Sequence, residues 1–245
     1  VVVIFQVQPI EKCMKKIKWN KRFKYPTSSR SVIRGSRHYD LGQEKLPSVT
    51  AILSATQSAE KMASLAKWKE RVGSKEADKI RDSAALRGTA MHAFLEAYLL
   101  GKDRVDLTPV GQAARIMGQR IADRGLADLD EIWGSEVTLY YPGLYAGATD
   151  LAGIYDGQES ICDFKQANKP KQKEWIGDYF TQLAAYAMAH NYVYNTKITQ
   201  GVILMCTKDN LFQKFVVDGQ EFIKFQHDFL RRVSQYYSDQ KPIVA

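Results

Sequence analysis

The chain has 245 residues, of which 45% are hydrophobic and 25% charged, proportions typical of one globular domain with a packed core. No run of about 18 apolar residues occurs, so we expect no transmembrane helix and no membrane partner. The three cysteines, Cys13, Cys162 and Cys206, form no Cys-x-x-Cys pair, which argues against a disulfide framework, a zinc ribbon and an iron–sulfur cluster. This cysteine usage favours a reducing, intracellular setting.

The net charge of +8 is concentrated at the N-terminus. Residues 1–39 contain ten Lys or Arg and one acid, whereas the remaining 206 residues contain 25 basic and 26 acidic side chains. We therefore expect residues 1–31 to form a basic arm, disordered at least in part, ahead of a folded domain at 32–245. The arm could follow a phosphate backbone, and a solvated tail or a targeting peptide are the alternatives.

A short apolar element at 47–53 opens the domain, and a helical periodicity follows it. The periodicity predicts helices at about 58–72, 75–86, 90–100 and 109–125, with glycines as stops and Thr89 as the cap of the third. Short β-prone segments then follow at 135–140, 146–155 and 160–165, separated by turn signals. A helix at about 174–190, strands at 201–206 and 212–217, and an amphipathic helix at about 219–237 complete the chain. This order predicts an α/β (α+β) fold with a central mixed β-sheet flanked by helices.

Two of the β-prone segments carry the residues that indicate chemistry. Asp150 lies on the second, and Asp163 and Lys165 lie on the third. Side chains alternate between the faces of a strand, so Asp163 and Lys165 point the same way, while Cys162 and Phe164 point into the opposite layer. A hairpin around Asp156-Gly157 would bring Asp150 close to Asp163. Two carboxylates and an ammonium group would then converge at one end of a sheet.

Phosphodiester hydrolysis requires such a set. Carboxylates bind hard cations such as Mg²⁺ or Mn²⁺, and the cation polarises a phosphoryl oxygen and activates water. A lysine supplies a positive charge near the attacking water and the developing negative charge. Gly147 and Gly153 flank Asp150 and could allow a nucleic-acid backbone to approach closely. The alternative is that an Asp and a Lys two apart simply lie on a solvated strand face.

Two further polar pairs flank these strands at helical spacing. His92 and Glu96 share one helix face, as do Gln182 and Tyr186. Ordinary structural roles are the alternative for both pairs. In this order and spacing, however, Gly-x-x-x-His-x-x-x-Glu, Gly-x-x-Asp, Asp-x-Lys and Gln-x-x-x-Tyr resemble the RecB-like branch of the PD-(D/E)xK nuclease superfamily.

Within that branch, further motifs resemble the mitochondrial genome maintenance exonuclease group and its phage relatives. Motifs that carry this resemblance include residues 37–39, 46–50, 163–171 and 183–186, and it covers the chain from about Val32 to the C-terminal helix. It implies a restriction-endonuclease-like core with Lys165 as the catalytic lysine. It also implies that Asp150 and Asp163 are the metal carboxylates, with the Phe164 carbonyl as a further ligand and His92 as a ligand or an orienting group. The supporting side chains would be Glu96, Gln182 and Tyr186, of which the last two would brace the site or contact the DNA strand. Thr149 and Gln166 depart from the superfamily pattern, and Gln166 puts the fine positioning of substrate in doubt.

Basic and aromatic residues after the third strand are candidates for contacts with DNA: Lys169, Lys171, Lys173, Trp175 and Tyr179. Trp68 is a further candidate for stacking on bases, with core packing as the alternative for each aromatic ring.

The resemblance implies a metal-dependent exonuclease acting on single-stranded DNA, with Mg²⁺ or Mn²⁺ as cofactor, in DNA replication, repair, recombination or degradation. An endonuclease or flap-type nuclease, and a non-catalytic DNA-binding module, are the alternatives. We expect a monomer in the cytoplasm of a bacterium or a phage-infected host, with the mitochondrion as the second location.

Overall fold

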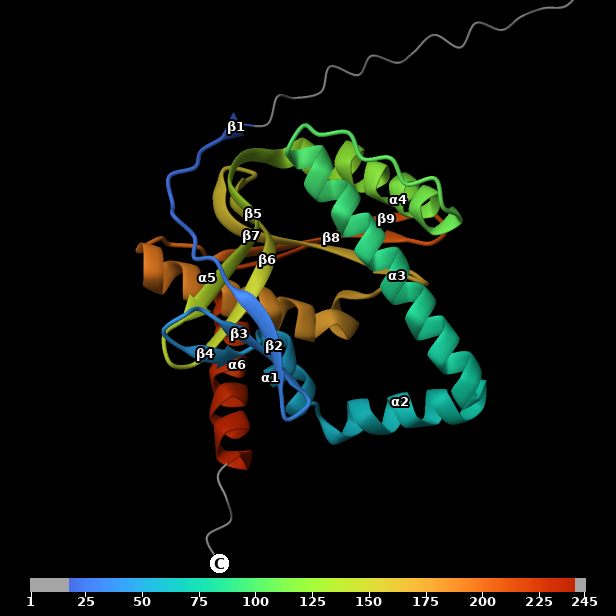
Figure 1. Cartoon of the computed structure of the whole chain (residues 1–245), viewed down its shortest axis with the longest axis horizontal. Helices are drawn as coiled ribbons and strands as arrows, with labels where there is room; N and C mark the ends of the chain where they lie inside the picture. The colour runs from blue at the N-terminus through green and yellow to red at the C-terminus, as the bar shows by residue number, and fades with distance from the viewer. Residues whose placement is uncertain (1–17, 241–245) are drawn as a thin grey trace, which may run out of the picture.

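A computed structural model describes residues 18–240, and a six-stranded sheet forms the centre of this region (Figure 1). The strand order is β1-β5-β6-β7-β8-β9, with β1 parallel to β5 and β7 parallel to β8, while the other neighbours are antiparallel. The strands are β1 (Lys18–Trp19), β5 (Leu129–Tyr141), β6 (Tyr145–Tyr155), β7 (Gln158–Ala167), β8 (Gln200–Thr207) and β9 (Phe212–Asp218). The mixed sheet that the sequence predicted is therefore confirmed.

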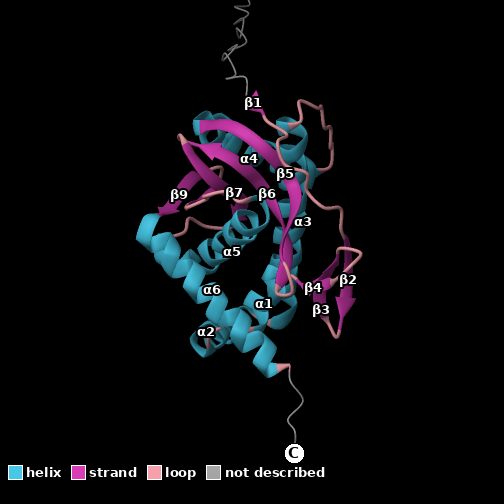
Figure 2. Ribbon diagram, turned by 90° about the vertical axis from the view of Figure 1, so that its left-hand side faces the viewer, coloured by secondary structure: helices cyan, strands magenta, loops and turns pink. Residues whose placement is uncertain are grey.

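Helices cover both faces of this sheet, and the two hydrophobic cores lie on either side of it. On one face α3 and α4 pack on β7, β8 and β9, and on the other face α5 and α6 pack on β5, β8 and β9 (Figures 1 and 2). The helices are α1 (Val49–Ala55), α2 (Ala59–Val72), α3 (Ser74–Leu99), α4 (Pro109–Gly125), α5 (Gly177–Tyr194) and α6 (Gly219–Asp239), with short 3-10 turns at Leu126–Asp128 and Lys173–Ile176. No helix in the described part of the chain is both long and apolar enough to cross a membrane.

The predicted break at Gly88 is wrong, because α3 runs without interruption through 26 residues. A glycine in a helix interior costs only about 1 kcal/mol, which packing can override. Here the neighbouring Arg87 donates hydrogen bonds to Gln166 and Asn168 at the end of β7. Buried Met91 anchors the following turn in the core. Thr89 therefore lies inside a helix and caps nothing.

The segment that we expected to be a separate basic arm differs from that expectation from Lys18 onward. Strand β1 pairs with β5, and the indole of Trp19 donates a hydrogen bond to the Leu99 carbonyl at the end of α3. Phe23 and Tyr25 pack around buried His190 of α5. The many basic and serine residues of this segment favoured the prediction of a solvated arm, so the packing was not predicted. Residues 1–17, including Cys13, lie outside the described region.

A second, smaller sheet also lies in the segment before the first predicted helix. Its strands are β2 (Ser29–Ile33), β3 (Ser36–Asp40) and β4 (Lys45–Pro47). The boundary expected at residue 31 therefore falls inside β2. Arg34 and Gly35 join β2 to β3 with positive φ at both residues, the backbone of a tight hairpin turn. This sheet lies beside β6, the strand that carries Asp150.

Candidate metal-dependent active site

The site lies where β6 and β7 separate. Their antiparallel pairing ends at Leu151 and Cys162, whereas β7 stays paired with β8 as far as Ala167. Beyond the last pair, Oδ2 of Asp150 accepts a hydrogen bond of 2.6 Å from the backbone N–H of Phe164. The Asp150 carboxylate therefore takes the place of the missing backbone partner, which a buried N–H requires.

The predicted alternation along β7 is confirmed. Cys162 and Phe164 are buried in the core beneath α3 and α4, while Asp163 and Lys165 face the other way. The Lys165 ammonium contacts Oδ2 of Asp163 in an ion pair, and it also lies 5.0 Å from the centre of the Tyr179 ring. No hydrogen bond of good geometry reaches that buried Oδ2 from any residue the structure describes.

Helix α3 supplies His92 from above the fork. Strand β5 supplies Glu136, which was not among the site residues expected from the sequence. Nδ1 of His92 lies 3.2 Å from Oδ1 of Asp150 and 3.9 Å from Oε1 of Glu136. These three residues offer ligand atoms that all lie within 4.8 Å of one another, so they could hold a metal ion. Glu136 adopts a positive φ of 53°, a conformation that costs free energy for a residue with a side chain.

The charged side chains of this group shift one another's pKa values. Burial and the charge of Asp150 raise the pKa of Asp163 to about 6, although Lys165 opposes the shift. Burial disfavours protonation of His92, but the charge and hydrogen bonding of Asp150, with Glu136, outweigh it and raise the pKa of His92 to about 10. Burial likewise opposes ionisation of Asp150, yet His92 and Lys165 hold its pKa below the usual value. Two carboxylates, an imidazolium and an ammonium group therefore balance one another at this site.

Helix α5 closes the opposite side of the site. Nε2 of Gln182 lies 3.5 Å from Oδ1 of Asp163 and 3.3 Å from the Tyr186 hydroxyl. Gly147 makes this approach possible, because a Cβ there would lie 2.6 Å from the Tyr186 ring. Gly153 in turn faces the β5 backbone, where a Cβ would lie 2.0 Å from a carbonyl oxygen. Gly153 therefore serves packing within the protein, while Gly147 both packs against Tyr186 and lines the cavity beside Asp150.

Two cavities lie beside these residues. The first, the catalytic cavity, has a volume of about 370 Å³ and is lined by groups that include Arg30, Arg37, His92, Glu136, Asp150, Gln182 and Tyr186. The second, the basic cavity, has a volume of about 950 Å³ and contains one acid, Glu76, in its lining. Its basic and aromatic lining residues are Trp68, Arg71, Lys79, Arg87, Lys169, Lys171, Tyr179 and Lys208. Gly88 lines the first cavity and Arg87 the second, so the two adjoin along α3.

Not every expected residue reaches the site. Glu96 lies one turn beyond His92 and lines neither cavity. Lys173 pairs with Glu221 at 2.7 Å, and Trp175 is 64% exposed on the turn before α5. Arg30 and Arg37 were not among our candidate site residues, although Arg37 belongs to one of the motifs that carry the family resemblance.

Comparison with known proteins gives distant relatives. No family model matches the chain. It is 28% identical over 203 residues to mitochondrial genome maintenance exonuclease 1 of Xenopus tropicalis, covering 78% of this chain and 57% of the relative. It is 25% identical over 217 residues to the human protein of the same name, covering 82% and 61%. The chain is a distant homologue of these exonucleases.

The homology has a limited extent. The chain spans about three-fifths of the length of the two relatives. A solved structure from Eubacterium rectale, described provisionally as an exonuclease, matches 64% of this chain and 65% of its own with a TM-score of 0.45 and 15% identity.

Proposed function

We propose that this protein is a metal-dependent exonuclease that hydrolyses the phosphodiester bonds of single-stranded DNA. The observation that carries the proposal is the convergence of Asp150, Asp163 and Lys165 at the fork between β6 and β7, with His92 above them. This is the residue set that we expected from the sequence. Homology to two proteins named as exonucleases supports the same reaction.

The residues at the fork fit a divalent cation. The carboxylates of Asp150 and Asp163 would hold it, with the Phe164 carbonyl and His92 as further ligands. In an extended strand the N–H and C=O of one residue point to the same side, so the Phe164 carbonyl faces the gap toward Asp150. Oxygen donors of this kind favour Mg²⁺ or Mn²⁺. The ligand atoms of His92, Glu136 and Asp150, which all lie within 4.8 Å of one another, support the fit.

The cation would polarise the phosphoryl oxygens and lower the pKa of a bound water. The side chains of the protein have separate tasks. The Lys165 ammonium orients the attacking water and offsets the negative charge that develops on the phosphate. Gln182, braced by Tyr186, keeps the Asp163 carboxylate in position from the α5 side. Burial of this carboxylate excludes bulk water and strengthens each of these interactions.

The basic cavity supports a nucleic-acid substrate. Lys169, Lys171 and Arg87 can contact phosphates, and Tyr179 and Trp68 offer ring surfaces on which unpaired bases can stack. Lys173 and Trp175 lie outside this cavity, so we assign the strand contacts to the residues that line it.

End-labelled linear and circular single strands, incubated with the protein and Mg²⁺, test the proposal. We expect degradation of the linear strand and survival of the circle, and no reaction in EDTA. Cleavage of the circle would show an endonuclease instead. Retention of both strands without cleavage would show a binding module.

A further inference from the structure

The β2–β3 hairpin brings two arginines into the catalytic cavity. Arg30 pairs with Tyr39 across the hairpin, and Val32 pairs with Arg37. Directly paired residues project from the same face of a two-stranded sheet, so these four side chains share one face. Arg30, Arg37 and Tyr39 line the catalytic cavity together with Asp150.

These two guanidinium groups are not neutralised by the protein. In the part of the chain that the structure describes, neither Arg30 nor Arg37 forms an ion pair, whereas Lys45 of the same sheet pairs with Asp40 at 3.1 Å. Val32 neighbours Arg30 along β2 and Arg37 across the hairpin, and it is 74% exposed. The Arg30 guanidinium lies over the Tyr39 ring at 5.6 Å, a contact that orients it but leaves its charge unpaired. Two guanidinium groups of this kind suit a ligand with anionic oxygens, because guanidinium binds phosphate through two parallel hydrogen bonds.

The hairpin is fixed relative to the acids of the site. The Arg37 carbonyl accepts a hydrogen bond of 2.9 Å from the Ser48 N–H, and Ser48 forms a β-bridge with Ala146 of β6. Tyr39 and Ala146 are buried together in a small cluster. Because Ala146 precedes Asp150 by four residues on the same strand, the arginines hold a defined position beside the reacting centre.

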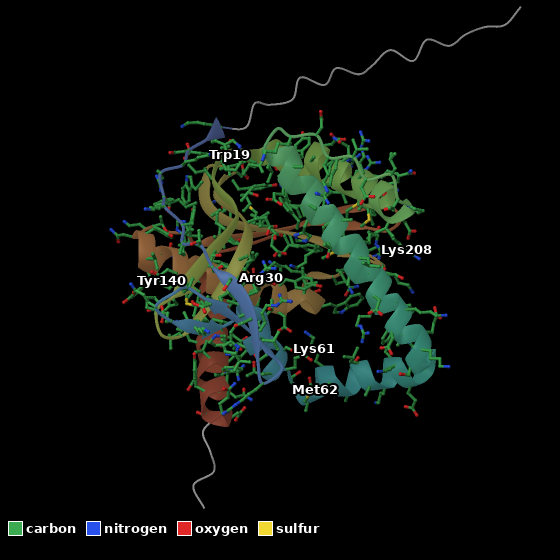
Figure 3. All side chains as sticks on the ribbon, in the orientation of Figure 1. Trp19, Arg30, Lys61, Met62, Tyr140 and Lys208 are labelled. Carbon is green, nitrogen blue, oxygen red and sulfur yellow. The ribbon has the colours of Figure 1, made fainter. Side chains whose placement is uncertain are left out.

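We propose that Arg30 and Arg37 form a phosphate-binding subsite for the backbone of the single strand, next to the bond that is cleaved. The proposal rests on the function proposed above and adds a second region of contact. In the view of Figure 3, Arg30 and Lys208 of the basic cavity lie on either side of α3. Because the two cavities adjoin along α3, the strand is held by basic side chains from both of them.

The dependence of DNA binding on salt measures these contacts directly. Each lost phosphate contact lowers the slope of log K against log salt by about 0.7 for single strands. With a labelled oligonucleotide in EDTA, Arg30→Gln and Arg37→Gln should each lower the slope by about 0.7 and the double variant by about 1.4. Arg34→Gln is the matched control: it removes the same charge from the turn of this hairpin, outside the cavity lining, and should leave the slope unchanged.

Replacing both arginines by lysine distinguishes an effect of lost charge from an effect of a disrupted hairpin. The variant with Arg30→Lys and Arg37→Lys should keep most of the slope, and unfolding midpoints near that of the unmodified protein show that the hairpin is intact. Equal slopes for Arg30→Gln, Arg37→Gln and Arg34→Gln would overturn the subsite. If the slopes change as expected but Mg²⁺ supports no hydrolysis, the nuclease proposal fails and the subsite stands. Absence of DNA binding in the unmodified protein would overturn both the proposed nuclease function and the phosphate-binding subsite.

Discussion

Replacing Lys165 by Met removes the ammonium group while keeping most of the side-chain volume. The Lys165 ammonium contacts the carboxylate of Asp163. Lys165 is not one of the proposed metal ligands, so its loss should leave them in place. Removing one preorganised donor from a developing negative charge lowers kcat by about 10²–10³, or about 3–4 kcal/mol of barrier. Cation affinity should stay the same or increase, because the ammonium competes with the cation for Asp163. Lys165→Arg should rescue little, since a planar guanidinium cannot replace a compact ammonium beside a water molecule.

Single-turnover hydrolysis of a labelled strand measures the rate, and calorimetric titration with Mn²⁺ measures the affinity. Lys224→Ala is the control, because Lys224 is an exposed lysine on α6 that lines neither cavity. A rate for Lys165→Met within a few-fold of the unmodified protein would refute the assignment of this lysine. Weaker Mn²⁺ binding would show that Lys165 organises the ligands, and the reasoning about competition would then be wrong.

Four further predictions concern residues at or near the site. Asp163→Asn should abolish hydrolysis yet retain single-strand binding in a gel shift, because it removes a charged ligand and keeps the shape. Gly147→Ala should lower the unfolding free energy, measured in urea, by about 1–3 kcal/mol, because its Cβ would lie 2.6 Å from the Tyr186 ring. Gly88→Ala should raise it by about 1 kcal/mol, because the new Cβ makes only an ordinary contact within a helix interior. In EDTA, the unfolding free energy should fall as the pH rises from about 6.5 to about 10, because only the folded state keeps His92 protonated in that window. The variant His92→Gln should remove this fall. Equal curves of unfolding free energy against pH for the two proteins would contradict the raised pKa of His92.

The strand pattern was sufficient to predict which side chains of β7 share a face. Alternation places Asp163 and Lys165 on one face whatever the rest of the fold does. The turn at Asp156-Gly157, where both residues have positive φ, then brings β6 alongside. Glu136 could not be found in this way, because a glutamate on a strand is usually solvated. Only the register of β5 against β6, with Val137 opposite Thr149, places it beside Asp150.

The small sheet was missed although a signal for it exists. Arg34-Gly35 lies between two short runs that pair residue by residue, and a residue followed by glycine is typical of a two-residue hairpin turn. The density of Arg, Lys and Ser in this region favoured a solvated arm instead. The packing that fixes Trp19 and Phe23 joins residues more than 75 positions apart in sequence, so no local pattern could reveal it.

The hydrogen bond from Phe164 to Asp150 has a consequence for how this chain can change over evolutionary time. A descendant that lost its catalytic activity would be free to vary at Lys165. At residue 150 it would still need an acceptor, because without one a buried N–H at the fork would have no partner. Asn or Ser could satisfy that need without holding a cation. Residue 165 should therefore change sooner than residue 150. An inactive paralogue should retain a polar residue at position 150 long after its lysine at position 165 has been lost.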